Sequence, residues 1–235
     1  MFAKQIGARE PVVKRLAKPR WAWLYADVAS SDRWKSEGED DPESEAAGVS
    51  TPPRILGLPA ADWDGTVRYY QDPSTERVQE HLALTAWINP TGIVGTDRFI
   101  IGKYGAGPTG LRWYLRNTNG QQYCVFQTAG GTAVFIEGST TVMEDEWQQV
   151  AIVYDPTTGY CRSYRNGIQT NETEVIVGGG AVVDSSVDLR IGCSQATSVF
   201  RGGIGLLGSL TEEILTDSEQ YIRELYEEQR HIFGV

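Results

Sequence analysis

The chain has 235 residues, of which 40% are hydrophobic and 10% aromatic, so it can build a sizeable hydrophobic core. Its formal net charge of −10 argues against nucleic acid as the main partner of the folded part. No apolar run approaches the ~20 residues that cross a bilayer, and none follows the basic N-terminus as in a signal peptide. We therefore expect neither membrane insertion nor signal-directed export.

Residues 1–34 are predicted to be a basic, aromatic N-terminal arm. Residues 1–20 carry six basic residues against Glu10, a net charge of +5. Two interpretations stay open: the aromatic side chains fold back over the domain, or they insert into a groove of a protein partner, where Trp and Tyr carry much of the binding energy. The candidate partner-binding residues are Arg15, Arg20, Trp21, Trp23, Tyr25 and Trp34.

Residues 35–56 are acidic, contain Pro and lack a run of large apolar side chains, which predicts a solvated linker. The spacing of their acidic residues differs from that of an EF-hand loop, so a calcium loop is not expected there. The folded domain is predicted to span residues 57–235.

Several segments of this domain alternate as β-strands do. Residues 82–90 place Leu82, Leu84, Ala86 and Ile88 on one face and Ala83, Thr85 and Trp87 on the other. Residues 111–116 place Leu111, Trp113 and Leu115 on one face and Arg112, Tyr114 and Arg116 on the other. Further strands are predicted at 98–105, 123–128, 132–137 and 187–192, which indicates an antiparallel architecture of two sheets.

Residues 145–167 contain the strongest local signal. The strand pattern at Val150, Ile152 and Tyr154 is followed by the turn sequence DPTTG at 155–159 and a second strand. Asn166-Gly167 then predicts a type I′ hairpin turn, which needs positive φ at both residues. Cys161 and Ser163 share one face of the second strand with Arg165, so we expect that face to be less apolar than a core face and open to solvent or a partner.

The end of the chain predicts a glycine-rich strand and a helix. Residues 202–208 contain four glycines, which favours a bulge or a close contact with a neighbour. Thr216 and Glu219 form a capping box that predicts the start of a helix. The predicted buried face of this helix contains Ile222, Leu225, Tyr226 and Gln229.

Several of these motifs, in this order, resemble the laminin-G-like or concanavalin A-like jelly roll. The segment LALTAWINP at 82–90 resembles the family pattern S-A-W-[IV]-x-P, and VDLRIG at 187–192 resembles its x-L-x-I-G strand. The resemblance implies an all-β fold: a two-sheet antiparallel jelly-roll sandwich with a short C-terminal helix, here preceded by an extended N-terminal arm. It covers residues 57–230 and says nothing about residues 1–56.

Domains of this kind mostly bind ligands, and we expect this chain not to be an enzyme. Retaining glycoside hydrolysis needs two carboxyl groups about 5–5.5 Å apart. The family's Glu-x-Asp-x-x-Glu signature is absent, and the contiguous acids at 144–146 alternate between faces. Neither His81 nor His231 lies beside a serine nucleophile motif.

A sugar site would combine aromatic rings with hydrogen-bonding side chains. We take Arg112, Tyr114, Arg116 and Arg165 as the candidate ligand-binding residues. The tryptophans Trp87, Trp113 and Trp147 are expected to pack in the core instead.

No cofactor is required by the sequence, although calcium is an option that relatives of this fold use. Asp62, Asp64 and Asp155 are the candidate metal ligands, since Ca²⁺ prefers carboxylate and carbonyl oxygens. The alternative is that they are turn aspartates that accept hydrogen bonds from backbone amides. The cysteines Cys124, Cys161 and Cys193 are expected to be reduced thiols in or near a sheet, with one disulfide as the alternative.

A fold typical of extracellular proteins without a signal peptide suggests assembly in the cytoplasm followed by release on a particle. We therefore expect a non-enzymatic virion component, a capsid decoration or tail-fibre module of a bacteriophage, held on a capsid or tail protein by its N-terminal arm. The alternative function is a carbohydrate-binding lectin-type module, calcium-assisted or not. A homo-oligomer is compatible with either function.

Overall fold

The structure is a computed structural model that describes residues 21–24, 33–36, 44–47, 54–55, 60–65, 69–72, 82–104, 110–129, 133–174, 180–183, 185, 187, 189–193, 198–210, 214–215 and 217–235. Within residues 21–55 and 69–72 the description covers the backbone alone. None of the helices in these ranges is long and apolar enough to span a membrane.

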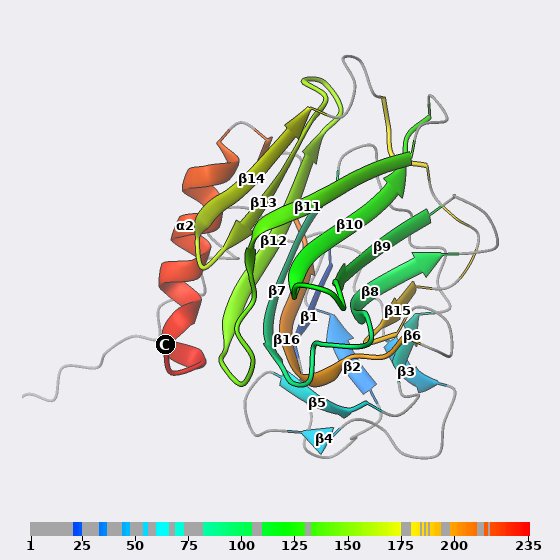
Figure 1. The fold of residues 1–235 in the computed structure, drawn as a ribbon, viewed down its shortest axis with the longest axis vertical. Coiled ribbons are helices and arrows are strands. Elements are labelled where there is room, and N and C mark those ends of the chain that lie inside the picture. Colours follow the sequence, from blue (N-terminus) through cyan, green and yellow to red (C-terminus); the bar gives the residue numbers. More distant parts are fainter. Residues whose placement is uncertain are drawn as a thin grey trace, which may run out of the picture.

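Two antiparallel sheets form the molecule (Figure 1). Sheet A has the order β14 (Ile168–Glu174), β13 (Tyr160–Arg165), β12 (Gln148–Asp155), β7 (Leu82–Pro90), β16 (Arg201–Ser209) and β1 (Trp21–Leu24). Strand β5 (Ala60–Asp64) pairs with β16 and with β4 (Arg54–Ile55). Sheet B has the order β11 (Ala133–Thr141), β10 (Gln121–Gln127), β9 (Gly110–Leu115), β8 (Arg98–Tyr104), β15 (Leu189–Ile191), β6 (Tyr69–Asp72) and β3 (Ser44–Ala47). The predicted two-sheet sandwich is confirmed.

The main hydrophobic core lies between the two sheets. Every second residue of β7 and β12 points into it, and β9 contributes its alternate face from the opposite sheet. Trp113 of β9 and Ile152 of β12 are fully buried there. The faces predicted for residues 82–90 and 111–116 are therefore confirmed. The core members from these three strands are Leu82, Leu84, Ala86, Ile88, Leu111, Trp113, Leu115, Val150, Ile152 and Tyr154.

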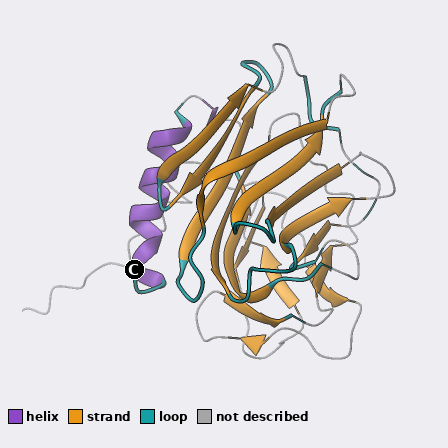
Figure 2. Cartoon of the chain, viewed as in Figure 1, coloured by secondary structure: helices purple, strands orange, loops and turns teal. Residues whose placement is uncertain are grey.

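Helix α2 (Ser218–Gln229) covers the opposite face of sheet A, as Figure 2 shows. Ile222 and Leu225 pack on the sheet-A residues Ala151 and Val153. The buried helical face predicted from the sequence is confirmed, but the predicted start of the helix is not. The N-cap is Asp217, whose side chain accepts the amide N–H of Gln220 at 3.1 Å, so the helix begins after Asp217 and not at the predicted Thr216 cap.

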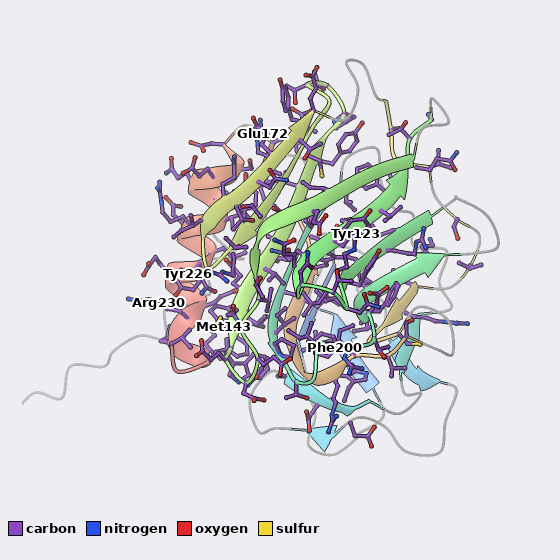
Figure 3. The ribbon with its side chains drawn as sticks, viewed as in Figure 1. Tyr123, Met143, Glu172, Phe200, Tyr226 and Arg230 are labelled. Atoms are coloured by element: carbon purple, nitrogen blue, oxygen red, sulfur yellow. The ribbon has the colours of Figure 1, made fainter. Side chains whose placement is uncertain are left out.

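An aromatic cluster fixes the C-terminal end of this helix to sheet A. Trp87 stacks with Phe233, at a ring distance of 4.5 Å, and with Tyr226, at 5.7 Å. The indole N–H of Trp87 donates to Oε1 of Gln229 at 2.7 Å, so this buried donor is satisfied. Figure 3 labels Tyr226 on the helix and Arg230 at the start of the short 3-10 helix η2 (Arg230–Ile232).

Strand β16 has the bulge that its glycines predicted. The register shifts between Gly205 and Gly208, and Leu206 has a φ of 40°. A Cβ atom at Gly203 would lie 2.5 Å from Cη2 of Trp147, so the indole rests directly on the backbone of β16. The absence of a side chain at Gly203 is therefore required for Trp147 to occupy its place.

The hairpin predicted at Asn166-Gly167 is confirmed. The φ values are 50° and 76°, both in the left-handed region that a type I′ turn needs. The side chain of Asn166 accepts the amide N–H of Gln149 at 2.9 Å, which ties the turn to β12. The turn joins β13 to β14 at the lower end of these two strands, beside helix α2 (Figure 1).

The prediction of an open face on β13 is wrong. Cys161 and Ser163 are both 0% exposed, because β11 of sheet B packs over this face. Oγ of Ser163 lies opposite Gly138 of β11 and shares a hydrogen bond of 2.8 Å with the hydroxyl of Thr170. A face that is polar in the sequence is thus buried here, because β11 packs over it and Thr170 of the neighbouring strand β14 satisfies the Ser163 hydroxyl.

The edges of the two sheets meet on this side of the molecule. Nδ2 of Asn171 on β14 donates to the carbonyl of Glu137 on β11 at 2.6 Å, and the hydroxyl of Ser139 donates to the carbonyl of Thr170. These bonds occupy backbone acceptors on strands that would otherwise be free edges.

The three cysteines are buried free thiols, as expected. Burial raises the pKa values of the Cys124 and Cys161 thiols, which keeps both protonated at neutral pH.

Four segments of residues 1–56 lie in the sheets, namely β1, β2 (Arg33–Ser36), β3 and β4. β1 pairs with β16, with Trp21 opposite Ser209 and Trp23 opposite Leu207. β2, which contains Trp34, joins β1 to β3, and β3 pairs with β6. Arg15, Arg20 and Tyr25 lie outside the described residues. The domain boundary at residue 57 and the partner-binding role of the arm stay predictions.

Replacing Gly203 by Ala tests the contact between β16 and Trp147. We expect Gly203→Ala to lower the free energy of unfolding by about 1–3 kcal/mol, because the new methyl group forces the indole away from the sheet. The control is Gly138→Ala, where the nearest atoms lie 3.5 Å from the added Cβ and no loss is expected. Urea unfolding measures both, and equal losses would contradict the assigned contact.

Candidate functional site

The outer face of sheet B carries a row of aromatic and charged side chains. Tyr114 of β9 lies opposite Phe99 of β8 and Tyr123 of β10, and Tyr123 lies opposite Glu137 of β11. All are on the face that points away from the core. We call the set Phe99, Arg112, Tyr114, Arg116, Tyr123 and Glu137 the aromatic platform.

The rings of the platform are held in contact. Phe99 and Tyr114 stack with centroids 4.7 Å apart and an interplanar angle of 18°. Tyr114 and Tyr123 are 5.2 Å apart and tilted by 52°. Phe99 is buried while the two tyrosines are partly exposed, so Phe99 supports the rings that reach the surface. Figure 3 labels Tyr123 over the strands of sheet B.

An arginine and a glutamate frame the tyrosines. The guanidinium of Arg116 lies 5.0 Å from the ring centroid of Tyr123, and its Nη1 is 3.0 Å from Oε2 of Glu137. These two charged side chains are 42% and 36% exposed. The second carboxylate oxygen of Glu137 accepts Nδ2 of Asn119 at 2.9 Å, which orients the carboxylate from both sides.

Burial and the nearby carboxylate of Asp97 raise the pKa of Tyr114, so its phenol stays a neutral hydrogen-bond donor. The hydrogen bond to Glu137 raises the pKa of Arg116. The platform therefore offers aromatic rings, a neutral phenol donor, a guanidinium and a carboxylate side by side.

A pocket of about 460 Å³ lies at the end of the sandwich, between the β11–β12 connection and the β13–β14 turn. One polar wall is acidic and consists of Asp145 and Glu146 on the connection. The other offers hydrogen-bond donors and consists of Arg165 at the end of β13 and Asn166 in the turn. We call it the turn pocket. Its remaining lining residues are Met143, Trp147, Gln148 and Val235.

Trp147 gives the turn pocket a rigid wall. Its benzo edge sits on Gly203, and its ring packs 4.7 Å from that of Phe233. In the described part of the chain no hydrogen bond is formed by its indole N–H or by the carboxylates of Asp145 and Glu146. Arg165 donates to the carbonyl of Thr141 through Nη1, which holds the guanidinium at the pocket wall. The remaining N–H groups of Arg165 and the Asn166 amide supply donors.

The structure divides the predicted ligand-binding residues. Arg112, Tyr114 and Arg116 come together on the aromatic platform, whereas Arg165 lies on sheet A and lines the turn pocket.

Sequence reasoning missed Tyr123 and Glu137. The turn at residues 117–120 could have identified Tyr123, because a short hairpin loop places Tyr114 opposite Tyr123. Glu137 could not be found this way, since β11 is bulged where it pairs with β10.

The candidate metal ligands are not brought together. Asp62 and Asp64 pair with Gly203 and Arg201, at the end of sheet A where β12 begins, whereas Asp155 ends β12. At ~3.4 Å per residue, the length of β12 separates them by roughly 20 Å or more. Among the described residues no group of three or more His, Cys, Asp or Glu side chains could hold a metal ion.

Asp155 instead organises the turn after β12. Its carboxylate accepts the amide N–H of Thr157 at 2.8 Å and the hydroxyl of Thr158 at 2.6 Å. Burial alone would raise the pKa of Asp155, but the hydrogen bonds from Thr158 and Thr157 outweigh it and lower the pKa. The carboxylate is thus stabilised in its charged form.

Asp155→Asn should therefore destabilise the protein in a pH-dependent way. The lowered pKa stabilises the fold above the unfolded value of about 3.9, and this contribution is lost as the pH falls through the folded value. We expect a deficit of about 1–2 kcal/mol at pH 7 that shrinks toward pH 3, measured by urea unfolding. Asp145→Asn is the control, because that exposed carboxylate forms no hydrogen bond in the described part of the chain; a deficit independent of pH would contradict the assignment.

The fold is shared with solved binding domains of botulinum neurotoxins. The receptor-binding domain of the C/D mosaic serotype matches with a TM-score of 0.67 and 13% identity over 90% of this chain and 51% of that one. The serotype D ligand-binding domain in complex with N-acetylneuraminic acid matches with a TM-score of 0.68 and 13% identity over the same shares, 90% and 51%. The serotype G binding domain matches with 0.62 and 12%, again over 90% and 51%.

This chain spans about half the length of those structures, and at such low identity the likeness concerns the fold alone. A search of the curated proteins finds no significant relative. A family model, by contrast, matches residues 64–207, which is more than half of the chain and contains most of both sheets. The chain belongs to the concanavalin A-like lectin/glucanases superfamily, as a laminin G type domain.

Proposed function

We propose that the protein is a non-enzymatic carbohydrate-binding module whose ligand lies on the aromatic platform. The observation that carries the proposal is the arrangement of Tyr114 and Tyr123, 5.2 Å apart, beside the Arg116–Glu137 pair on a face of sheet B that points away from the core.

The chemistry of the platform matches that of a sugar ring. A sugar presents an apolar face of C–H groups that can rest on an aromatic ring, and hydroxyl groups around its edge that both donate and accept hydrogen bonds. Arg116 supplies donors, and Glu137 supplies acceptors in a fixed orientation. Because the pair is formed before any ligand arrives, little side-chain entropy is lost on binding.

The family and the fold support a binding role. The superfamily of this chain contains both lectins and glucanases, and one solved structure of the same fold holds N-acetylneuraminic acid. The sugar in that structure belongs to a chain about twice as long, so it is support for the class of ligand only.

A place on a virion surface is a separate proposal, which rests on the basic and aromatic N-terminal arm. It is compatible with glycan binding, because a particle can display a lectin on its surface. A truncation that tests the arm has to end before Trp21, since β1 pairs with β16 and its removal would expose an edge of sheet A.

Arg116→Gln tests the proposed site. We expect the variant to lose binding to the saccharide selected on a glycan array by about tenfold or more, because a central arginine of a binding site is often worth over 1 kcal/mol. Its thermal stability should change little, since an exposed ion pair contributes about 0–1 kcal/mol. Isothermal titration calorimetry and thermal unfolding measure the two quantities.

The chain offers a matched control in Arg162→Gln. Arg162 pairs with Glu172 at 2.5 Å and lies 5.8 Å from the ring centroid of Tyr160, so it repeats the platform's chemistry on sheet A. This variant should bind the saccharide as the wild type does. Equal losses in both variants, or no binding to any glycan on the array, would sink the proposal.

A further inference from the structure

The aromatic platform and the turn pocket are neighbours across strand β11. Arg165, in the pocket wall, donates to the carbonyl of Thr141, and Thr141 pairs with Gln121 of β10. The carbonyl of Gln121 in turn accepts the backbone N–H of Arg116 on the platform at 2.9 Å. Two strand spacings of ~4.8 Å therefore place the backbone of Thr141, which Arg165 contacts, roughly 10 Å from the backbone of Arg116.

Figure 3 labels one residue at each of the two features. Tyr123 lies over sheet B, and Met143 lies at the start of the β11–β12 connection beside the pocket. Met143 is 51% exposed, and the guanidinium of Arg165 extends from sheet A to the carbonyl of Thr141 at the end of β11.

The turn pocket has the chemistry of a second saccharide subsite. Its indole N–H, its two exposed carboxylates and the remaining N–H groups of Arg165 and Asn166 suit hydroxyl groups, which donate and accept at the same atom. Trp147 and Met143 add an apolar surface. A volume of about 460 Å³ is in the range of ligand sites.

We propose that the two features form one extended site that takes an oligosaccharide chain, lying on the aromatic platform at one end and entering the turn pocket at the other. This inference rests on the proposed function, because it assigns a second contact to the same ligand. A single sugar ring does not reach both ends, whereas a chain of several units does.

Such a site makes affinity depend on ligand length. Once one end of the oligosaccharide is bound, the other end is held near its subsite at high effective concentration. A chain long enough to fill both subsites should therefore bind much more tightly than a short one. Shortening the oligosaccharide or disabling either subsite should remove the same gain in affinity.

The experiment is a calorimetric titration with β-glucan, chitin and α-mannan oligosaccharides of one to six units. For the wild type we expect affinity to rise by about tenfold or more once the chain spans both subsites. Arg165→Gln and, as a milder change, Glu146→Gln should remove this increment. Arg162→Gln should keep the increment.

Each outcome separates this inference from the proposed function. If short saccharides bind at Arg116 but affinity does not rise with length, or if both pocket variants keep the rise, the extended site is overturned and the platform stands. If no saccharide of any length binds, both fail. Thermal unfolding of the Glu146→Gln variant checks that a lost increment does not come from a damaged fold.

Discussion

The rest of the structure depends on the burial of sheet A on both of its faces. Strand β12 is buried along its whole length: Val150, Ile152 and Tyr154 face the inter-sheet core, while Ala151 and Val153 face helix α2. Burying apolar surface at ~25 cal/mol per Å² is the main stabilising contribution of such a layer, and a second apolar face has to be covered as well. The C-terminal helix is therefore a structural requirement of this sheet.

This constraint bears on the proposed ligand site. Helix α2 covers much of the outer face of sheet A, whereas the outer face of sheet B carries the aromatic and charged side chains of the platform. Trp87 shows how far the coverage of sheet A extends, since Phe233, Tyr226 and Gln229 close around it at the helix end. Trp147 packs against Phe233 and lines the turn pocket, so the same packing shapes the second candidate subsite.

Local patterns in the sequence predict much of this fold. The alternation in residues 82–90 identifies both buried faces of β7. The dipeptide Asn166-Gly167 identifies the β13–β14 hairpin by its backbone preferences alone. The helix start was misplaced by one residue because Thr216 and Asp217 are both good caps, and only geometry decides between them.

Features that depend on long-range packing could not be predicted. The face of Ser163 is buried because β11 crosses it, and the turn pocket combines segments that are distant in the sequence, from Asp145 to Val235. The sequence predicts only part of the platform. Alternation groups Arg112, Tyr114 and Arg116 on one face, but the pairing of Tyr123 with Glu137 follows from a bulged register. The segment SEAA at 44–47 is a strand without the β-branched or aromatic residues that favour one, since its partner β6 supplies the ladder.

The most direct test of the account is to map the ligand surface by NMR. Titration of the tightest-binding oligosaccharide into ¹⁵N-labelled protein should shift the backbone amides of Tyr114, Arg116 and Tyr123 on the platform, together with the indole N–H of Trp147 in the turn pocket. Shifts confined to β13, β14 and helix α2, around Arg162 and Glu172, would place the ligand on the opposite sheet and contradict the account.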